Sequence, residues 1–452
     1  MVFAKMAAKA LGDIMKLDGK YRILHSCQGL LCSAAFGYNA FYLSEYGFHA
    51  SEIGIIVAVF GVLTAICLPI FGRIADKSRR FNWKVLLALF CAFGILDWGL
   101  LFFCKSKLVV GILFQLTGLV VSCILPMMNV ACFYYEKRGI YVNYGIARGL
   151  NSLVYAVCSF VLGRLTVGFG TPAIVAVGFV VSVITLFTVM SLPYGKSAAD
   201  KGTEGANAAD RSAEGANASG RSTANTNTAD SSTANTVNRN AADKYAETRM
   251  QKKAEKKFWK KYPAFMVMVL GCVFLMSTFS LSNTFLINVI EEAGGNSQHL
   301  GTALAISALA EVPVLMLFSH IVKRIPETKL LIFAGAAYAL KCFVLFCADN
   351  IPMVYAAQLL QMFSYALYAS ASVYFSDKCM EEGDEVTGQT LISMCGSAGT
   401  VIGSLVGGYV VEAAGVRVML AGGMMTAVVT ACVFGIAARM YRREQERKAA
   451  VG

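Results

Sequence analysis

Apolar runs long enough to cross a lipid bilayer recur along almost the whole chain of 452 residues. The hydrocarbon core of a bilayer is about 30 Å thick, so a spanning helix needs about 20 apolar residues. Runs of that length stand on both sides of a long polar stretch. Their approximate bounds are 22–46, 53–73, 83–104, 108–134, 144–168, 172–193, 264–290, 299–322, 329–347, 352–377, 387–412 and 416–438. This pattern predicts an all-α membrane protein with twelve transmembrane helices in two bundles of six.

Composition excludes the other classes of protein. The chain is 56% hydrophobic and 15% charged, whereas soluble domains carry about 25% charged residues. The net charge of +12 comes from basic residues between the apolar runs, so it predicts membrane topology and no nucleic-acid partner. The 14 cysteines lie in or beside apolar runs without a CxxC pair. We therefore expect reduced packing residues, no metal site and no cofactor.

The distribution of Lys and Arg predicts the orientation of the chain. Cytoplasmic loops of membrane proteins carry an excess of these residues. With the N-terminus inside, the outer loops hold only Lys105, Lys107 and Arg417, while the inner loops and tails hold most of the others. We therefore expect a multi-pass protein of the cytoplasmic (inner) membrane with both termini in the cytoplasm. The basic residues before the first run also indicate that this run is not a cleaved signal peptide.

The polar stretch between the two sets of runs differs abruptly from the rest of the chain. It is rich in Ala, Asn, Ser, Thr and Asp and has almost no large apolar residue, so burial cannot offset its ordering entropy. We expect a disordered cytoplasmic linker. The predicted organisation is a cytoplasmic N-terminal tail at 1–21, a six-helix bundle at 22–195, the linker at 196–263, a second six-helix bundle at 264–438 and a cytoplasmic tail at 439–452.

The loop between the second and third runs carries a recognisable motif. It begins at Gly72 and contains Asp76, Lys77 and Arg80. The sequence resembles the signature loop of the major facilitator superfamily, in which a glycine is followed after three residues by an aspartate and basic residues. The resemblance implies the fold of that superfamily and assigns these four residues to a gating motif. A layout of six spans, a long linker and six more spans is similar to the same superfamily.

A narrower resemblance lies in the fifth run. Its segment from Tyr144 through Arg148 to Tyr155 is similar to the oligosaccharide/proton symporter branch, which includes lactose permease. There an arginine at this place binds sugar hydroxyls, and Lys341 stands where those relatives have a proton-coupling arginine. In the tenth run the relatives carry a histidine and, three residues later, a glutamate that takes the proton. This chain has Gln361 and Ser364 there, and neither side chain titrates near neutral pH.

Ionisable residues within the apolar runs are candidates for function, because a charge at membrane depth costs about 2.5–3.5 kcal/mol on insertion scales. Glu311 lies mid-run and precedes Pro313 by two residues. We expect it to be the proton-coupling carboxylate, with Lys341 as its partner; the alternative is a purely structural pair. Asp97 is a further candidate for proton coupling. For Arg148 a substrate-binding role competes with that of a charge at the cytoplasmic surface.

Uncharged polar side chains in the runs favour a polar, neutral solute. Amides and aromatic rings bind sugars and nucleosides, although such residues also hydrogen-bond between helices. The candidate substrate-binding residues are Tyr38, Asn39, Gln115, Asn129, Arg148, Asn151, Tyr155, Gln358 and Gln361.

These features predict a secondary active transporter and no enzyme. We expect a monomer in the lipid bilayer that moves a sugar, an oligosaccharide or a nucleoside by alternating access, with protons as the coupled ion. The chain has no P-loop and no Ser-x-x-Lys or His-Glu-x-x-His pattern, so ATP-driven transport and the corresponding hydrolases are not indicated. An exporter of drugs or metabolites is one alternative. A transporter-like nutrient sensor is the other.

Overall fold

The computed structural model is helical wherever it describes regular structure. It describes residues 2–77, 82–136, 138, 140, 142, 144–194, 258–381 and 384–451. Most of the expected linker, 195–257, lies outside these residues. The two helical halves on either side of it form one compact unit, Met1–Leu192 together with Ala264–Gly452.

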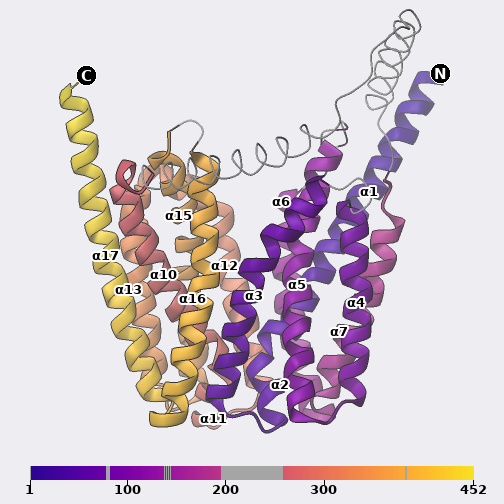
Figure 1. Cartoon of the computed structure of the whole chain (residues 1–452), viewed down its shortest axis with the longest axis horizontal. Helices are drawn as coiled ribbons and strands as arrows, with labels where there is room; N and C mark the ends of the chain where they lie inside the picture. Colours follow the sequence, from indigo (N-terminus) through magenta and orange to yellow (C-terminus); the bar gives the residue numbers. More distant parts are fainter. Residues whose placement is uncertain are drawn as a thin grey trace, which may run out of the picture. The chain divides into compact units, whose positions relative to one another are not determined.

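The helices follow the apolar runs closely (Figure 1). The first half contains α1 (Val2–Cys32), a π-helix (Ser33–Gly37), α2 (Asn39–Glu45), α3 (Ala50–Lys77), α4 (Trp83–Phe103), α5 (Lys107–Glu136), α6 (Tyr144–Phe169) and α7 (Pro172–Ser191). The second half contains α10 (Pro263–Thr284), α11 (Leu286–Glu292), α12 (Ser297–Arg324), α13 (Glu327–Phe346), α14 (Ile351–Leu359), a 3₁₀-helix (Leu360–Met362), α15 (Tyr365–Cys379), α16 (Glu385–Ala414) and α17 (Val416–Val451).

Ten of the described helices are long and apolar enough to cross a membrane. They are α3, α4, α5, α6, α7, α10, α12, α13, α16 and α17. Three predicted spans, 22–46, 264–290 and 352–377, are not single helices in the structure, and the second of these breaks at Phe285 between α10 and α11. A π-helix interrupts the span at 22–46 and a 3₁₀-helix the span at 352–377. Such irregular turns are frequent at functional sites and need polar or protein surroundings within a membrane.

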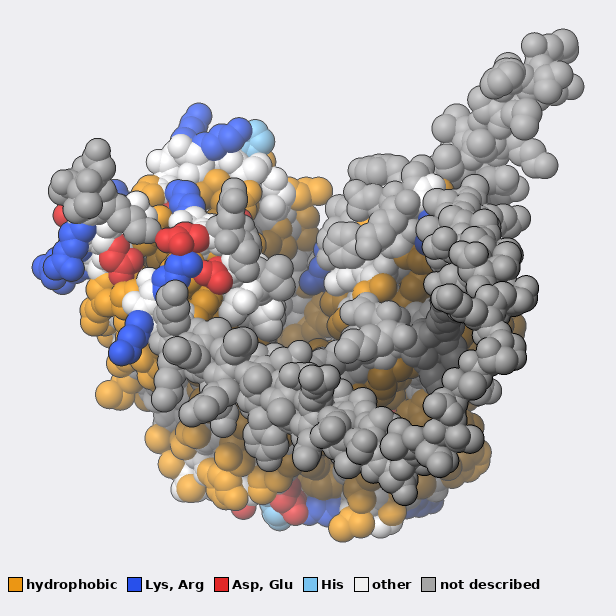
Figure 2. Space-filling model, turned by 45° about the horizontal axis from the view of Figure 1, so that its top comes forward, with side chains coloured by type: hydrophobic (Ala, Val, Ile, Leu, Met, Phe, Trp, Pro, Cys, Tyr) orange, Lys and Arg blue, Asp and Glu red, His pale blue; other side chains and the backbone are white. Residues whose placement is uncertain are grey.

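The surface of the spanning helices is apolar. Large hydrophobic side chains are exposed on many of them, including Leu96 of α4, Phe187 of α7 and Met316 of α12. Figure 2 shows hydrophobic side chains, in orange, over the side of the molecule below the charged residues at the top of the view. A soluble monomer rarely exposes contiguous apolar surface of this extent, so this side is suited to contact with lipid.

Tight turns mark one end of the helical unit, which we name the opposite end because both termini lie at the other end (Figure 1). Each of these turns contains a glycine with positive φ: Gly47, Gly170, Gly294 and Gly415. Residues with a Cβ rarely adopt this conformation. The turns join α2 to α3, α6 to α7, α11 to α12 and α16 to α17. We name the end that holds the two termini the terminal end.

Two helix pairs join the halves. Within the first half α1 packs on α6 and α4 packs on α5 and α7, and within the second half α13 packs on α17. Between the halves α3 contacts α16 and α6 contacts α12. Glycines permit these contacts near the opposite end: a Cβ on Gly54 would lie 3.2 Å from Gly408 Cα, and one on Gly163 would lie 3.0 Å from Gly301 Cα.

The last helix continues beyond the final predicted span. That span is 416–438 and the predicted tail is 439–452; α17 runs without a break from Val416 to Val451 and so includes most of the residues of that tail. Its last part is rich in Arg, Glu, Gln, Lys and Ala, which have high helix propensity, so the helix persists after its apolar part ends.

Candidate functional site

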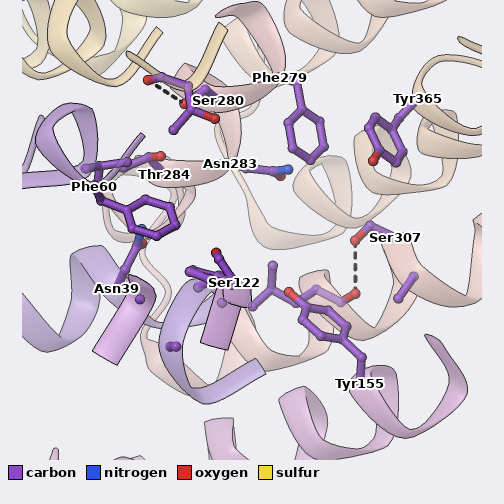
Figure 3. Close-up of a pocket in the computed structure, with 18 of the residues that line it drawn as sticks. Asn39, Phe60, Ser122, Tyr155, Phe279, Ser280, Asn283, Thr284, Ser307 and Tyr365 are labelled. Atoms are coloured by element: carbon purple, nitrogen blue, oxygen red, sulfur yellow. Dashed lines mark hydrogen bonds between the residues drawn. The ribbon is translucent and has the colours of Figure 1, made fainter. Parts of the chain in front are cut away.

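A cavity of about 460 Å³ lies between the two halves. Its walls come from the π-helix, α2, α3, α5 and α6 of the first half and from α10, α12, the 3₁₀-helix, α15 and α16 of the second. This volume falls within the range of small-molecule binding sites. Figure 2 shows the surface hollowed between the halves at the terminal end. Figure 3 shows side chains of both halves pointing toward the same space.

One face of α6 supplies a polar row to the cavity. Arg148, Asn151 and Tyr155 all line it, because residues three and four apart share one face of a helix. Arg148 Nη1 lies 3.4 Å from Asn151 Oδ1. Asn151 Nδ2 donates to the carbonyl oxygen of His25 in α1 at 2.9 Å. The amide therefore links the arginine to a fixed helix, while the guanidinium itself remains exposed.

The interrupted first span places Asn39 in the cavity wall. Asn39 begins α2 directly after the π-helix and Tyr38, and its Oδ1 accepts from the N–H of Ala40 at 2.6 Å. The π-helix also brings Gly37 to the wall. An uninterrupted helix would place these residues on different faces, so the irregular turn shapes this side of the site.

Gln115 of α5 lines the cavity but also joins two helices. Its amide nitrogen donates to Ile56 O in α3 at 2.6 Å, and its amide oxygen accepts from the N–H of Phe60. Polar residues in the apolar runs were expected either to bind the solute or to hydrogen-bond between helices, and this contact is of the second kind. Gln115 therefore fixes the wall formed by α3 and α5.

A three-residue polar chain leads from the cavity into the second half. Glu311 of α12 lines the cavity, and its Oε1 accepts from Gln361 Nε2 at 3.0 Å. Gln361 Oε1 in turn accepts from Lys341 Nζ of α13 at 2.5 Å. Lys341 is only 1% exposed and lies behind the wall. The expected partnership of Glu311 and Lys341 is thus mediated by Gln361 and involves no direct ion pair.

Aromatic rings form two sides of the cavity. Phe279 and Tyr365 of the second half are stacked, with ring centroids 4.6 Å apart and an angle of 22° between their planes. Phe36 and Phe60 of the first half pack with centroids 5.4 Å apart. The faces of such rings suit the apolar faces of sugars and bases. Figure 3 shows the polar side chain of Asn283 beside Phe279.

Besides Lys341, four of the predicted substrate-binding and proton-coupling residues lie away from the cavity wall. Tyr38 is buried and donates to Ser159 O at 2.6 Å, while Asn129 and Gln358 do not contribute to the lining. Asp97 is 2% exposed and accepts from the Thr117 hydroxyl inside the first half. Tyr38 lies at the contact between α6 and α12, where a Cβ on Gly163 would lie 3.0 Å from its hydroxyl oxygen, and Asp97 lies inside the first half. Spacing along one helix could not distinguish these positions from the cavity face.

Part of the predicted gating motif can be placed. Gly72, Asp76 and Lys77 belong to the last turns of α3, at the terminal end. Arg80 lies outside the described residues.

Several lining residues were not predicted as site residues. They are mainly small hydroxyl and aromatic side chains: Phe36, Phe60, Ser122, Ser152, Phe279, Ser280, Thr284, Ser307, Tyr365 and Thr400. One signal was present, since Ser280, Asn283 and Thr284 are spaced along a single face of α10. Within the described part of the chain, no group of three His, Cys, Asp or Glu side chains could hold a metal ion.

Comparisons with known proteins agree with this architecture. The sequence model of the MFS_1-like family matches residues 29–421. A search of curated protein sequences finds no significant match.

Solved transporters share the fold at low sequence identity. A single-site mutant of the nucleoside transporter NupG is 14% identical, with a TM-score of 0.73 over 93% of this chain and 99% of the other. The POT family transporter PepTSo is 11% identical, with a TM-score of 0.67 over 95% and 98%. A bacterial homologue of the iron transporter ferroportin, in an inward-facing state, is 13% identical, with a TM-score of 0.65 over 94% and 98%. The chain belongs to the MFS_1-like family and has the fold of a multi-pass major facilitator transporter.

Proposed function

We propose that the protein is a secondary transporter that moves a small polar solute, a sugar, an oligosaccharide or a nucleoside, by alternating access. The observation that carries this proposal is the cavity lined by both halves, with amides, hydroxyls and aromatic rings on its walls. A solute bound there contacts both halves, so their relative motion would expose it to one side of the membrane and then to the other.

The proposal includes twelve spans in two bundles of six. The protein would lie in the cytoplasmic (inner) membrane, with both termini in the cytoplasm. Ten helices are long and apolar enough to span a membrane. They become twelve spans when the segment with the π-helix, 22–46, and the segment with the 3₁₀-helix, 352–377, are each counted as one. In this orientation the structure corresponds to an inward-open state, because the glycine contacts join the halves near the opposite end and Figure 2 shows a hollow at the terminal end.

Proton coupling belongs to the same proposal, with Glu311 as the coupling carboxylate. Among the side chains that line the cavity, Glu311 is the acidic one and Arg148 the basic one. They come from different halves and line the same cavity. Movement of the halves would change the interaction between their charges and so favour binding or release of a proton.

Different observations favour different solutes, and the transport assay described below distinguishes among them. The NupG likeness and the stacked aromatic pair support a nucleoside, whereas the opposite charges of Arg148 and Glu311 in the cavity wall would suit the two charged ends of a dipeptide. An exporter of organic cations would be favoured by more acidic groups in the wall than this cavity has.

Counterflow in proteoliposomes tests the transport proposal. Purified protein is reconstituted with labelled uridine, galactose, lactose or dialanine, and exchange is followed with and without a pH gradient. We expect saturable exchange of at least one ring-bearing solute. Saturable binding without movement would indicate a sensor, and movement of lipophilic cations alone would indicate a drug exporter.

The topology is tested separately with a tag inserted at residue 220. If this tag is reachable from outside intact cells, the proposed orientation is wrong.

A further inference from the structure

Gln361 occupies an unusual position, between a buried ammonium and a carboxylate. Its side chain is 2% exposed, and both ends of its amide are engaged, one by Lys341 at 2.5 Å and the other by Glu311 at 3.0 Å. The interrupted tenth span positions it, because Gln361 is the central residue of the 3₁₀-helix between α14 and α15.

The chemistry of the three groups fixes the orientation of the amide. An ammonium group only donates hydrogen bonds, so the oxygen of Gln361 must face Lys341. The amide nitrogen must then face Glu311, whose carboxylate only accepts when ionised. A hydroxyl or a hydrocarbon at this position could not satisfy both neighbours over the same distance.

Lys341 has few alternatives to this acceptor. It is 1% exposed, and its ammonium also lies over the ring of Tyr338, whose centroid is 5.7 Å away. Removing one partner of a buried charge is strongly destabilising. Without the amide, the carboxylate of Glu311, at the far end of the same chain of hydrogen bonds, is a group of opposite charge that could compensate the ammonium.

From this geometry we infer that Gln361 is a positioning residue: a neutral spacer that satisfies Lys341 and thereby keeps Glu311 from being locked into a direct ion pair. The carboxyl then stays at the cavity wall, available to the solute and to a proton. This inference rests on the proposed coupling role of Glu311 and deepens it.

The other ionisable groups around Glu311 come from three helices. Arg148 and Tyr155 of α6 and Tyr365 of α15 line the same cavity as Glu311, and the ring of Tyr338 of α13 lies beside Lys341. Arg148 belongs to the other half, so its influence changes when the halves move. Lys341 belongs to the same half as Glu311, so a direct pair with it would persist in every state. Such a pair would remove the change on which coupling depends.

The first test separates coupling from exchange. Gln361→Leu is reconstituted, and both counterflow and accumulation driven by a pH gradient are measured with the labelled solutes named above. Gln361 lines the cavity, so the readout is the ratio of accumulation to counterflow, and we expect this ratio to fall to background in Gln361→Leu. The double variant Gln361→Leu with Lys341→Met should regain accumulation, because Lys341 is no longer present to form a direct ion pair with Glu311. Gln358→Leu is the matched control, since it replaces a buried amide of the same half outside the cavity wall, and it should not separate the two modes.

Three results would overturn the inference. They are accumulation by Gln361→Leu at the parental level, equal loss of both transport modes in that variant, and a double variant no better than the single one.

A second test needs no transported solute. Melting in detergent can be followed through the reactivity of buried cysteines such as Cys272 and Cys342. On this inference the lysine pairs with Glu311 in Gln361→Leu and keeps Gln361 in Glu311→Leu, whereas the double variant removes both acceptors. We expect the double variant to melt several degrees below the sum of the single effects. Additive effects would overturn the inference, even if the parent protein moves none of the chosen solutes.

Discussion

Gly163 of α6 and Gly301 of α12 meet backbone to backbone near the opposite end of the molecule. A Cβ on Gly163 would lie 3.0 Å from Gly301 Cα and 2.8 Å from Ser297 O. Both obstacles are backbone atoms, which cannot move aside as a flexible side chain can. This contact joins the two halves directly, and the Gly54–Gly408 contact joins them a second time near the same end.

Substitution of Gly163 tests the importance of this contact. Gly163→Ala should lower counterflow by about tenfold, a cost of about 1.4 kcal/mol in the closed contact. Gly168→Ala is the control on the same helix, because a Cβ there meets nothing within 4 Å. The control should leave counterflow unchanged and stabilise α6 slightly. Equal behaviour of the two variants would mean that close approach of α6 and α12 is not required for transport.

Replacement of Glu311 tests its role in coupling. Glu311→Gln retains a hydrogen-bond acceptor for Gln361 but cannot exchange a proton. Accumulation driven by a pH gradient should therefore fall to a ratio of about one, while counterflow persists, as expected for loss of the acid-base group alone. Transport in proteoliposomes with an imposed pH gradient measures both. If the variant still concentrates solute like the parent, Glu311 is structural.

Asp97 provides a matched carboxylate outside the cavity. It accepts from Thr117 within the first half, so Asp97→Asn should leave the ratio of accumulation to counterflow unchanged. Asp97→Leu leaves the Thr117 hydroxyl without this acceptor and should cost about 1–3 kcal/mol of stability, seen as a lower melting temperature in detergent. Selective loss of accumulation in Asp97→Asn would move the coupling role from Glu311 to Asp97.

Arg148 tests recognition of the solute. Arg148→Lys keeps the charge but loses the planar set of five donors, so the half-saturation concentration in counterflow should rise by about tenfold. Arg164→Lys is the control on the same helix, because Arg164 packs over the Phe160 ring at 3.4 Å and is absent from the cavity wall. An unchanged half-saturation concentration in Arg148→Lys would indicate that this residue is a surface charge.

The sequence by itself determined the class and the order of elements, since both follow from local properties. Runs of about 20 apolar residues must form spanning helices, and α3–α7, α12 and α13 lie close to the predicted bounds. The cost of a charge at membrane depth likewise indicated Glu311, Lys341 and Arg148, of which Glu311 and Arg148 line the cavity and Lys341 lies directly behind its wall. The motifs at Gly72 and Tyr144 indicated the family.

Only the tertiary structure decided which helix faces meet. Asp97 and Glu311 have similar apolar surroundings along the chain, yet one lies inside the first half and the other at the cavity wall. The π-helix before Asn39 and the 3₁₀-helix at Gln361 change which residues share a face, so helical spacing could not predict them. From the sequence, Gln361 was interpreted only as a residue that cannot titrate at a place where the relatives have a residue that can. Its role as the link between Lys341 and Glu311 exists because α12, α13 and the 3₁₀-helix converge, which depends on contacts between residues far apart in the sequence.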